Sequence, residues 1–341
     1  MKKTLIVVGT RPEAIKLAPL ILALQKDTRF TTRVCLSGQH ADLISPIFDF
    51  FGITADYDLA IMRPNQQLSD ITSKLLTGLM PILDDFCPDF VIVQGDTSTA
   101  FSAALAAFYR KIPVLHVEAG LRSPLPMSPF PEEMNRQVIS RIVNIHLCPT
   151  EFNKKNLEKE NINDKIYVIG NTGLDNIDKT GCEYGNKVLI TMHRRDNHEI
   201  MDKWFEEIEK IANKYIDIEF MIPLHPNPNV QKYKYIFNKV KVKEPMSHKD
   251  LINYIKKCKF VISDSGGLQE ECSYLNKKII ICRKTTERPE SIDIHGFLCS
   301  NPSELECVVE KINNNFKVNS KCPYGDGKSW EKIKYIIENF L

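Results

Sequence analysis

Three carboxylates of this sequence stand where they could exchange protons with a substrate. Two follow apolar runs, and the third lies at a predicted helix start. Asp96 comes after the run 90–93, and Glu118 comes after the run 114–117. Glu132 stands in the proline-rich segment SPFPEEMNR, which predicts a helix start. Three carboxylates that share one crevice repel each other and raise a pKa, which is how proteins make a general acid from a glutamate. Structural roles would also explain two of these residues. Asp96 could be the N-cap of a helix, and the charge of Glu132 could complement a helix dipole.

Basic side chains and glycines stand at predicted helix starts, where free backbone N–H groups favour an anion. Arg11 and Lys16 flank the start that the proline of GTRPEAIK predicts. The turn Ser265-Gly266-Gly267 leads from an apolar run into another helix and could present N–H groups to a pyrophosphate. An ordinary strand–helix turn with surface cations, or a simple helix cap, would explain the same residues without a ligand.

Further polar residues accompany these turns. Glu271 lies one predicted helical turn beyond the glycines, where it could accept from sugar hydroxyls, and we expect Glu270 to be a solvated or packing neighbour. Arg288 could add positive charge for the same anion. His193 precedes two arginines that could hold phosphates, whereas a structural role is favoured for His225.

The elements that must position these residues are predicted by short apolar runs. The runs do not alternate polar with apolar residues, which is typical of strands covered on both faces and hence of parallel sheets. Amphipathic or alanine-rich helices are predicted between them, over 14–25 and 98–109. This alternation predicts an α/β fold with doubly wound architecture. The predicted strands are 5–8, 34–36, 90–93, 114–117, 188–190, 220–222, 260–262 and 279–281.

The strand–helix alternation loosens between residues 170 and 187, where Asn, Gly and Asp gather, and it restarts at residue 188. We therefore expect two domains with their boundary in this segment. A length of 341 residues and an apolar content of 43% allow a core for each domain. The segment 328–341 has the pattern of an amphipathic helix.

Composition and motifs argue against several classes of protein. A net charge of +2 provides no general field for nucleic acid or an anionic membrane. No glycine-rich dinucleotide or P-loop motif follows a strand, and no HExxH or clustered Cys/His set predicts a metal site. The ten cysteines are scattered without a C-x-x-C pair, as buried free thiols are. No window approaches the ~18 apolar residues of a membrane helix, so we expect a cytoplasmic protein.

A series of ordered motifs resembles one known family, the non-hydrolysing UDP-N-acetylglucosamine 2-epimerases. The resemblance implies a B-type glycosyltransferase fold, α/β, in which two Rossmann-like domains have the active site in the cleft between them. The implied domains are 1–171, joined by helix 328–341 packing back on it, and 172–327, which binds the nucleotide. The motifs are GTRPEAIKLAPL, GQH, QGDT, HVEAGLR, SPFPEEMNR, PTE, GNT, HRRDN, HPNPNV, DSGGLQEE, TTERPE and PYGDG.

The family inverts C2 of a UDP-sugar without an added cofactor. By resemblance, a base removes the C2 proton as UDP leaves C1, and UDP then returns to the bound 2-acetamidoglucal with protonation on the other face. The implied acid and base residues are Asp96, Glu118 and Glu132, with His193 assisting at the leaving phosphate. The implied nucleotide contacts are Arg11, Lys16, Ser265, Gly266, Gly267, Glu271 and Arg288, with Glu271 at the uridine ribose. The family precedent is a homodimer that serves cell-surface polysaccharide synthesis.

Many bacterial members of the family bind a second UDP-N-acetylglucosamine as an activator beside the active site. Gln39, His40, Gln66 and Glu133 match the residues that hold it. Asp42 and Asn65 replace a glutamine and an arginine of the pattern, which loses a cation and gains an acid, so the sequence leaves activation open.

Two further departures concern the nucleobase, because His248 and Leu251 stand where the family usually has Tyr and Phe. Shortened segments after residue 197 and around 294–297 could shift the substrate toward a modified UDP-sugar.

Two alternative functions stay open. One is a hydrolysing epimerase that releases free N-acetylmannosamine, and the other is a glycosyltransferase that uses Glu118 as its base.

Overall fold

The computed structural model describes residues 1–39, 41–63, 66–123, 125, 127 and 129–340. The chain divides into two compact units. The first consists of Met1–Asn176 with Gly325–Leu341, and the second of Ile177–Tyr324. The sequence placed the corresponding domain boundaries at 171 and 327.

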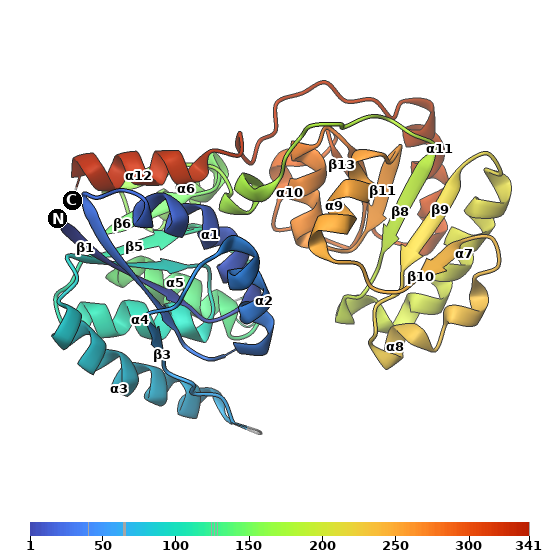
Figure 1. Ribbon diagram of the computed structural model, residues 1–341. Coiled ribbons are helices and arrows are strands. Elements are labelled where there is room, and N and C mark those ends of the chain that lie inside the picture. Colours follow the sequence, from blue (N-terminus) through green and yellow to red (C-terminus); the bar gives the residue numbers. More distant parts are fainter. Residues whose placement is uncertain (40, 64–65, 124, 126, 128, 341) are drawn as a thin grey trace. The chain divides into compact units, whose positions relative to one another are not determined.

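The first unit is built on a seven-stranded sheet in the order β3-β2-β1-β4-β5-β6-β7, in which every neighbouring pair is parallel (Figure 1). Parallel strands need crossover connections, and helices supply them here. The strands are β1 (Lys2–Val8), β2 (Phe30–Leu36), β3 (Tyr57–Asp58), β4 (Phe90–Gln94), β5 (Val114–Val117), β6 (Ile145–Cys148) and β7 (Ile166–Val168). The helices are α1 (Arg11–Gln25), α2 (Ala41–Phe51), α3 (Leu68–Phe86), α4 (Ser98–Tyr109), α5 (Glu132–Ile142), α6 (Glu151–Lys159) and α12 (Ser329–Phe340), with a 3-10 turn η1 (Thr172–Asn176).

Helices cover both faces of this sheet, which is why its central strands are apolar throughout. Alternate residues of β1 point to different cores: Ile6 and Val8 pack with α1, α2 and α12, whereas Leu5 and Val7 pack with α3 and α4. The period of two along a strand sends successive side chains to opposite faces. The prediction of a parallel, doubly covered sheet is confirmed.

The second unit repeats the plan with a six-stranded parallel sheet in the order β10-β9-β8-β11-β12-β13 (Figure 1). Helices α7 and α11 share one core with the sheet, and α9 and α10 lie on the other face. The strands are β8 (Lys187–Thr191), β9 (Glu219–Pro223), β10 (Lys241–Lys243), β11 (Phe260–Ser263), β12 (Lys278–Cys282) and β13 (Gly296–Cys299). The helices are α7 (Met201–Lys214), α8 (Pro228–Gln231), α9 (His248–Lys256), α10 (Gly266–Tyr274) and α11 (Leu305–Asn314), with 3-10 turns η2 (Arg195–Ile200), η3 (Lys234–Ile236), η4 (Pro289–Ser291) and η5 (Pro302–Glu304).

Helix α12 belongs to the first unit although it follows the second in the sequence. Ile333 and Ile337 are fully buried in the core beside α1. The carboxylate of Asp175 accepts the backbone N–H groups of Ser329 (2.9 Å) and Trp330 (2.8 Å), and so stabilises the start of the helix. The amphipathic segment predicted at 328–341 therefore completes a core formed by residues far earlier in the chain.

Each sheet has a point where its strand order reverses, and the polar turns lie there. In the first unit β1 stands between β2 and β4, and in the second β8 stands between β9 and β11. In open α/β sheets, ligands bind beyond the carboxyl ends of the strands at such a point. The turns after β1, β4 and β5, and those after β8 and β11, carry the residues that the sequence singled out.

Candidate active site

Glu118 and Lys16 contact each other at the carboxyl edge of the first sheet. The Lys16 ammonium lies 2.5 Å from Glu118 Oε2, and the Gln94 side chain donates to the same oxygen. Glu118 directly follows β5, Gln94 ends β4, and Lys16 lies in the second turn of α1. The Glu118 side chain is only 11% exposed, so this pairing compensates a charge that water hardly reaches. The topology thus brings together a predicted base and a predicted anion-binding residue.

The backbone of Glu118 lies in the left-handed region, with φ of +69°. A glutamate adopts this conformation at a free-energy cost, and such residues gather at functional sites. Gly120, two residues later, has φ of +84° and lies so close to α6 that a Cβ would be 2.2 Å from the carbonyl oxygen of Asn153. Only glycine fits there, so HVEAG forms a tight, fixed turn that directs Glu118 outward from the sheet edge.

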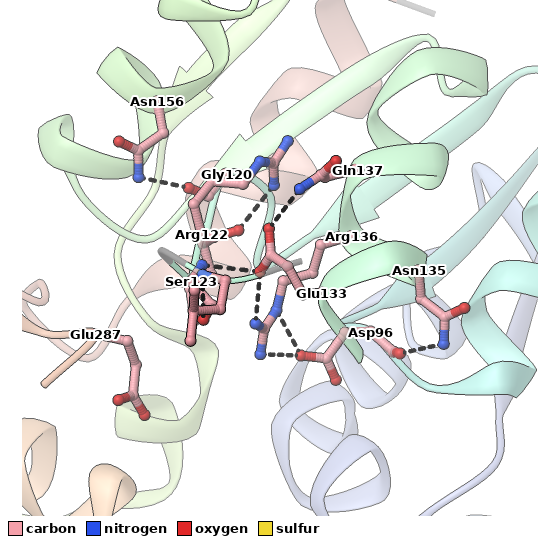
Figure 2. A network of polar contacts seen from close by, with 12 residues as sticks. Asp96, Gly120, Arg122, Ser123, Glu133, Asn135, Arg136, Gln137, Asn156 and Glu287 are labelled. Carbon is pink, nitrogen blue, oxygen red and sulfur yellow. Dashed lines mark hydrogen bonds and ion pairs between the residues drawn. The ribbon is translucent and has the colours of Figure 1, made fainter. Parts of the chain in front are cut away.

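Asp96 is held by an arginine that the sequence did not single out. Arg136 on α5 donates from Nε (2.8 Å) and approaches with Nη2 (2.5 Å), both to Asp96 Oδ2, and Asn135 donates to the Asp96 backbone carbonyl (Figure 2). Burial raises the pKa of Asp96, and the negative charge of Glu118 raises it further, against the lowering effect of Arg136 and Lys16. Asp96 and Glu118 are therefore electrostatically coupled, as the sequence predicted for carboxylates in one crevice.

The two glutamates at the start of α5 have different surroundings. Glu133 is completely buried and accepts from the Ser123 backbone N–H (2.8 Å), from Arg136 (3.1 Å) and from Gln137 (3.0 Å), as Figure 2 shows. The Oε2 atom of Glu132 is buried and has no hydrogen-bond partner among the residues that the structure describes. A buried carboxylate oxygen without such a partner can accept a hydrogen bond from a bound ligand.

Two residues at the start of α1 have opposite environments. Arg11 is exposed at the first helical position, where the expected anion would meet it. Glu13 is 1% exposed and accepts the backbone N–H groups of Gly9 (2.9 Å) and Thr10 (2.5 Å) as well as the Thr97 hydroxyl (2.8 Å). Burial raises the pKa of Glu13 to about 7 despite these hydrogen bonds. The pattern T-x-x-E of a capping box, formed by Thr10 and Glu13, is the sequence signal that could have identified it.

The second unit contains a cavity of about 280 Å³ at the carboxyl edge of its sheet. It combines imidazoles, a carboxylate, a glycine turn and an apolar wall. Such a mixture suits a ligand with an apolar ring and several polar groups. The lining residues are Thr191, Met192, His193, Pro223, His225, Pro245, Met246, His248, Leu251, Ser265, Gly267, Leu268 and Glu271.

His193 is fixed by a carboxylate that the sequence analysis did not assign. Asp264 is fully buried and accepts the backbone N–H groups of His193 (3.0 Å) and Arg194 (2.9 Å) and the Asn197 amide (3.1 Å). Its Oδ1 also lies 3.3 Å from His193 Nδ1. The ring of His225 stacks on His193 with centroids 5.4 Å apart, so His225, for which a structural role was favoured, belongs to the cavity.

The start of α10 is packed against Arg288. A Cβ on Gly266 would be 2.7 Å from Arg288 Nη1, whereas a Cβ on Gly267 would have no heavy atom within 4 Å. The first glycine therefore admits the arginine, and the second opens to the cavity. Arg288 itself pairs with Glu287 (2.5 Å) and with Glu270 (2.8 Å).

These ion pairs decide between the two roles expected for Glu270. It is a packing neighbour and not a solvated side chain, because it is buried against Arg288. Burial alone would raise the pKa of Glu287, but Arg288 and Arg283 lower it to about 2. Arg288 is not among the described residues that line the cavity, and its guanidinium, packed against Gly266, is already paired with two carboxylates.

Glu271 lies in the second turn of α10 and lines the cavity. Its Oε1 is 2.8 Å from Nε2 of His248, the first residue of α9. Leu251, the other departure from the family pattern, lines the same cavity.

Comparison with known proteins connects these sites to a family. A family model described as UDP-N-acetylglucosamine 2-epimerase matches residues 22–338. The chain belongs to this epimerase family. It is 41% identical to UDP-N-acetylglucosamine 2-epimerase of Campylobacter jejuni, with 99% of this chain and 97% of that protein covered. The crystal structure of UDP-GlcNAc 2-epimerase from Neisseria meningitidis bound to UDP-GlcNAc matches with a TM-score of 0.87 and 38% identity, over 99% of this chain and all of that one.

The fold of this epimerase also resembles MurG of Acinetobacter baumannii, with a TM-score of 0.66 at 10% identity and full coverage of both chains. At that identity the likeness concerns the fold alone. It agrees with the expected B-type glycosyltransferase class, in which each domain is Rossmann-like.

The residues expected to hold an activator in this epimerase are mostly engaged within the first unit. Gln39 Oε1 accepts from the Thr99 hydroxyl (2.9 Å), and Gln66 Oε1 accepts the Arg63 backbone N–H (2.6 Å). Glu133 is buried in the network described above. His40 and Asn65 lie outside the described residues, as does the side chain of Asp42.

Within the residues that the structure describes, no group of three or more His, Cys, Asp or Glu side chains is arranged to hold a metal ion. No helix in the same part of the chain is long and apolar enough to cross a membrane.

Proposed function

We propose that this epimerase interconverts UDP-N-acetylglucosamine and UDP-N-acetylmannosamine without hydrolysis, by anti elimination of UDP and its re-addition to 2-acetamidoglucal. The observation that carries the proposal is the separation of two kinds of chemistry between the units. Coupled carboxylates with fixed cations stand at the sheet edge of the first unit. A glycine turn, imidazoles and the carboxylate of Glu271 line a cavity in the second unit.

Glu118, Asp96 and Glu132 are the proposed proton-transfer groups. Removal of a proton from C2 needs a carboxylate held in a fixed position, and the Lys16 contact of 2.5 Å with the strained Glu118 backbone provides one. Asp96, whose pKa burial raises, suits the return of a proton. Glu132 has a buried oxygen without a partner among the described residues and is the third candidate. Epimerisation requires protons to move on opposite faces of the sugar, which one carboxylate cannot serve alone.

The second unit is proposed to hold UDP while it is bonded to the sugar and after it departs. Ser265 and Gly267 would offer backbone N–H groups at the start of α10 to the pyrophosphate. Arg288 is proposed to contribute from beside Gly266, where it shares its charge with Glu270 and Glu287. His193, fixed by Asp264, would stabilise the departing phosphate. Glu271 would accept the ribose hydroxyls. Holding UDP after the C1–O bond breaks is what allows it to add back rather than be lost.

Binding of UDP-GlcNAc to the related enzyme from Neisseria meningitidis supports this substrate class. Elimination followed by addition involves no net oxidation, so the proposed reaction needs no added redox cofactor. We also expect a homodimer, and we expect any response to an activating UDP-GlcNAc to be weak, because Glu133 is already engaged by internal contacts.

The experiment that tests the proposal is incubation with UDP-N-acetylglucosamine in heavy water, followed by NMR of the C2 proton and the products. We expect deuterium at C2 of both UDP-sugars and no free sugar. Release of N-acetylmannosamine and UDP would instead identify a hydrolysing epimerase. Absence of deuterium uptake would favour a glycosyltransferase, and uptake that occurs only with a modified UDP-sugar would redefine the substrate.

Variants separate the roles of the two units. Replacing Glu118 or Glu132 with Gln should abolish C2 deuterium uptake while UDP still binds, because most of the proposed nucleotide contacts lie in the other unit. Glu331→Gln, at an exposed position of α12, is the matched control and should exchange like the wild type. Undiminished exchange in both test variants would remove these carboxylates from the mechanism.

A further inference from the structure

His248 makes one direct contact with the proposed ribose-binding group. Its Nε2 lies 2.8 Å from Glu271 Oε1, and both side chains line the cavity of the second unit. An ionised carboxylate only accepts hydrogen bonds, so the imidazole must carry the proton on Nε2 and donate it. The contact joins the first residue of α9 to the second turn of α10.

The geometry leaves Glu271 able to take a ligand as well. A carboxylate has about four lone-pair sites, and the His248 contact occupies one of them. The others remain for two hydroxyl groups on adjacent carbons. What the imidazole adds is orientation, because a glutamate side chain has several rotatable bonds and loses that freedom when one oxygen is held.

Residues other than His248 cap helix α9 and bury it against the unit. Ser247 caps α9 by accepting the Asp250 backbone N–H (3.2 Å), and Ile252 and Ile255 bury the helix against the unit. The His248 side chain remains 33% exposed within the cavity wall. Helix capping and core packing therefore continue without the ring.

We propose that His248 is a positioning residue that orients Glu271 toward the ribose hydroxyls and so makes the site select ribonucleotides over deoxyribonucleotides. This inference rests on the proposed function, because it takes the cavity of the second unit as the uridine site. It identifies a polar interaction at a position where the family pattern has an aromatic residue. The ligand class it selects is a nucleoside diphosphate with both ribose hydroxyls present.

The test compares binding of UDP and 2′-deoxy-UDP by calorimetry to the full-length protein and three variants. His248→Phe keeps a ring but lacks the donor, and His248→Gln keeps an N–H that can reach a carboxylate. Asn253→Ala changes an exposed residue of the same helix and serves as control. We expect the wild type to prefer UDP, the preference to fall about tenfold in His248→Phe, and the Gln variant and the control to retain most of it.

Kinetics with UDP-N-acetylglucosamine give a second readout. His248→Phe should raise KM while kcat stays within about twofold, since ribose binding is the same in ground and transition states. An unchanged UDP to 2′-deoxy-UDP ratio in His248→Phe, or an equal weakening of both nucleotides, would overturn the inference. A wild type that binds UDP with the expected preference but fails to epimerise would refute only the proposed function. A wild type that does not bind UDP would refute both.

Discussion

At the scale of single residues, the closest contact between predicted site residues joins Lys16 to Glu118, which are far apart in sequence. The sequence indicated Lys16 as an anion-binding group because it flanks a helix start. It could not show that β5 delivers a carboxylate to the same point, since that follows only from the strand order of the sheet. The Lys16 ammonium is therefore paired with Glu118 and would have to be shared with any phosphate that enters.

Asp264 is the residue whose role sequence reasoning missed most completely. It begins the motif DSGGLQEE, in which the sequence predicted ligand contacts for the glycines and for a later glutamate but not for the aspartate. A buried carboxylate that orients a histidine has no signature in a single sequence, because its donors come from another loop. Arg136 is a similar case, as its partner Asp96 lies on a different strand end.

Asp264→Asn should lower kcat at least tenfold and reduce the free energy of unfolding by about 1–3 kcal/mol. The amide has one acceptor oxygen for four donors and turns its own N–H group toward them, so the loop at His193 must shift. Steady-state kinetics and urea denaturation measure the two effects. Asp196→Asn, an exposed position in the same loop, is the control. Wild-type kcat in Asp264→Asn would show that His193 needs no such orientation.

At the scale of elements, the apolar runs predicted eight strands, and all eight are confirmed. The strands not predicted are short or carry polar residues, such as β6 with His146 and β10, which alternates lysine with valine. Hydrophobic periodicity is weak in such segments, and their pairing partners decide their structure. Edge strands β3, β7, β10 and β13 fall mostly in this class.

The start of α10 provides a prediction about packing. Gly266→Ala should destabilise the second unit, because the added Cβ would be 2.7 Å from Arg288 and 2.9 Å from Glu287 and would separate that ion pair from the helix. Gly267→Ala meets no neighbour and should stabilise the helix by up to about 1 kcal/mol. Thermal unfolding in the absence of nucleotide compares the stabilities of the two variants. Equal stability of the two would contradict the packing account.

The buried Glu13, near the turn between β1 and α1, predicts how the free energy of unfolding depends on pH. The folded state keeps the Glu13 proton up to a pKa of about 7, whereas the unfolded chain loses it near 4.5. The folded state therefore binds more protons between these values, and stability falls as pH rises from about 4.5 to about 7. Glu13→Gln cannot titrate. The difference in unfolding free energy between wild type and variant should shift against the wild type by up to roughly 3 kcal/mol over this range.

Urea denaturation of both proteins at pH 5 and pH 8 measures this shift. Glu331→Gln, whose carboxylate is exposed, controls for unrelated titrations and should follow the wild type. Parallel pH dependence of the wild type and Glu13→Gln would mean that the buried carboxyl titrates alike in the folded and unfolded states.

At the scale of the whole molecule, each unit has a core of its own. The core around Trp204 and Phe205 draws only on residues of the second unit, whereas those around Leu5 and Ile6 draw only on the first. The sequence indicated two domains, because the alternation of predicted strands and helices loosens near residues 170–187 and then restarts. Where the first domain resumes could be inferred only from family resemblance, because an amphipathic helix does not reveal its partner.

The second unit should bind UDP on its own. Residues 177–324 are contiguous, enclose a core and contain all the described residues that line the cavity proposed to hold UDP. We expect this fragment to fold and to bind UDP more weakly than the full chain, since Arg11 is absent, and to show no C2 exchange. Calorimetry and NMR in heavy water test both parts. A folded fragment without UDP affinity would mean that the first unit supplies the main nucleotide contacts.

The position of α12 has a consequence for synthesis on the ribosome. Domains usually fold in the order in which they leave it. Here the first unit lacks the side chains of Ile333 and Ile337 until every residue of the second has been translated. We therefore expect the apolar side chains of α1 that α12 covers to stay exposed during that interval, and the second unit to complete its core before the first does.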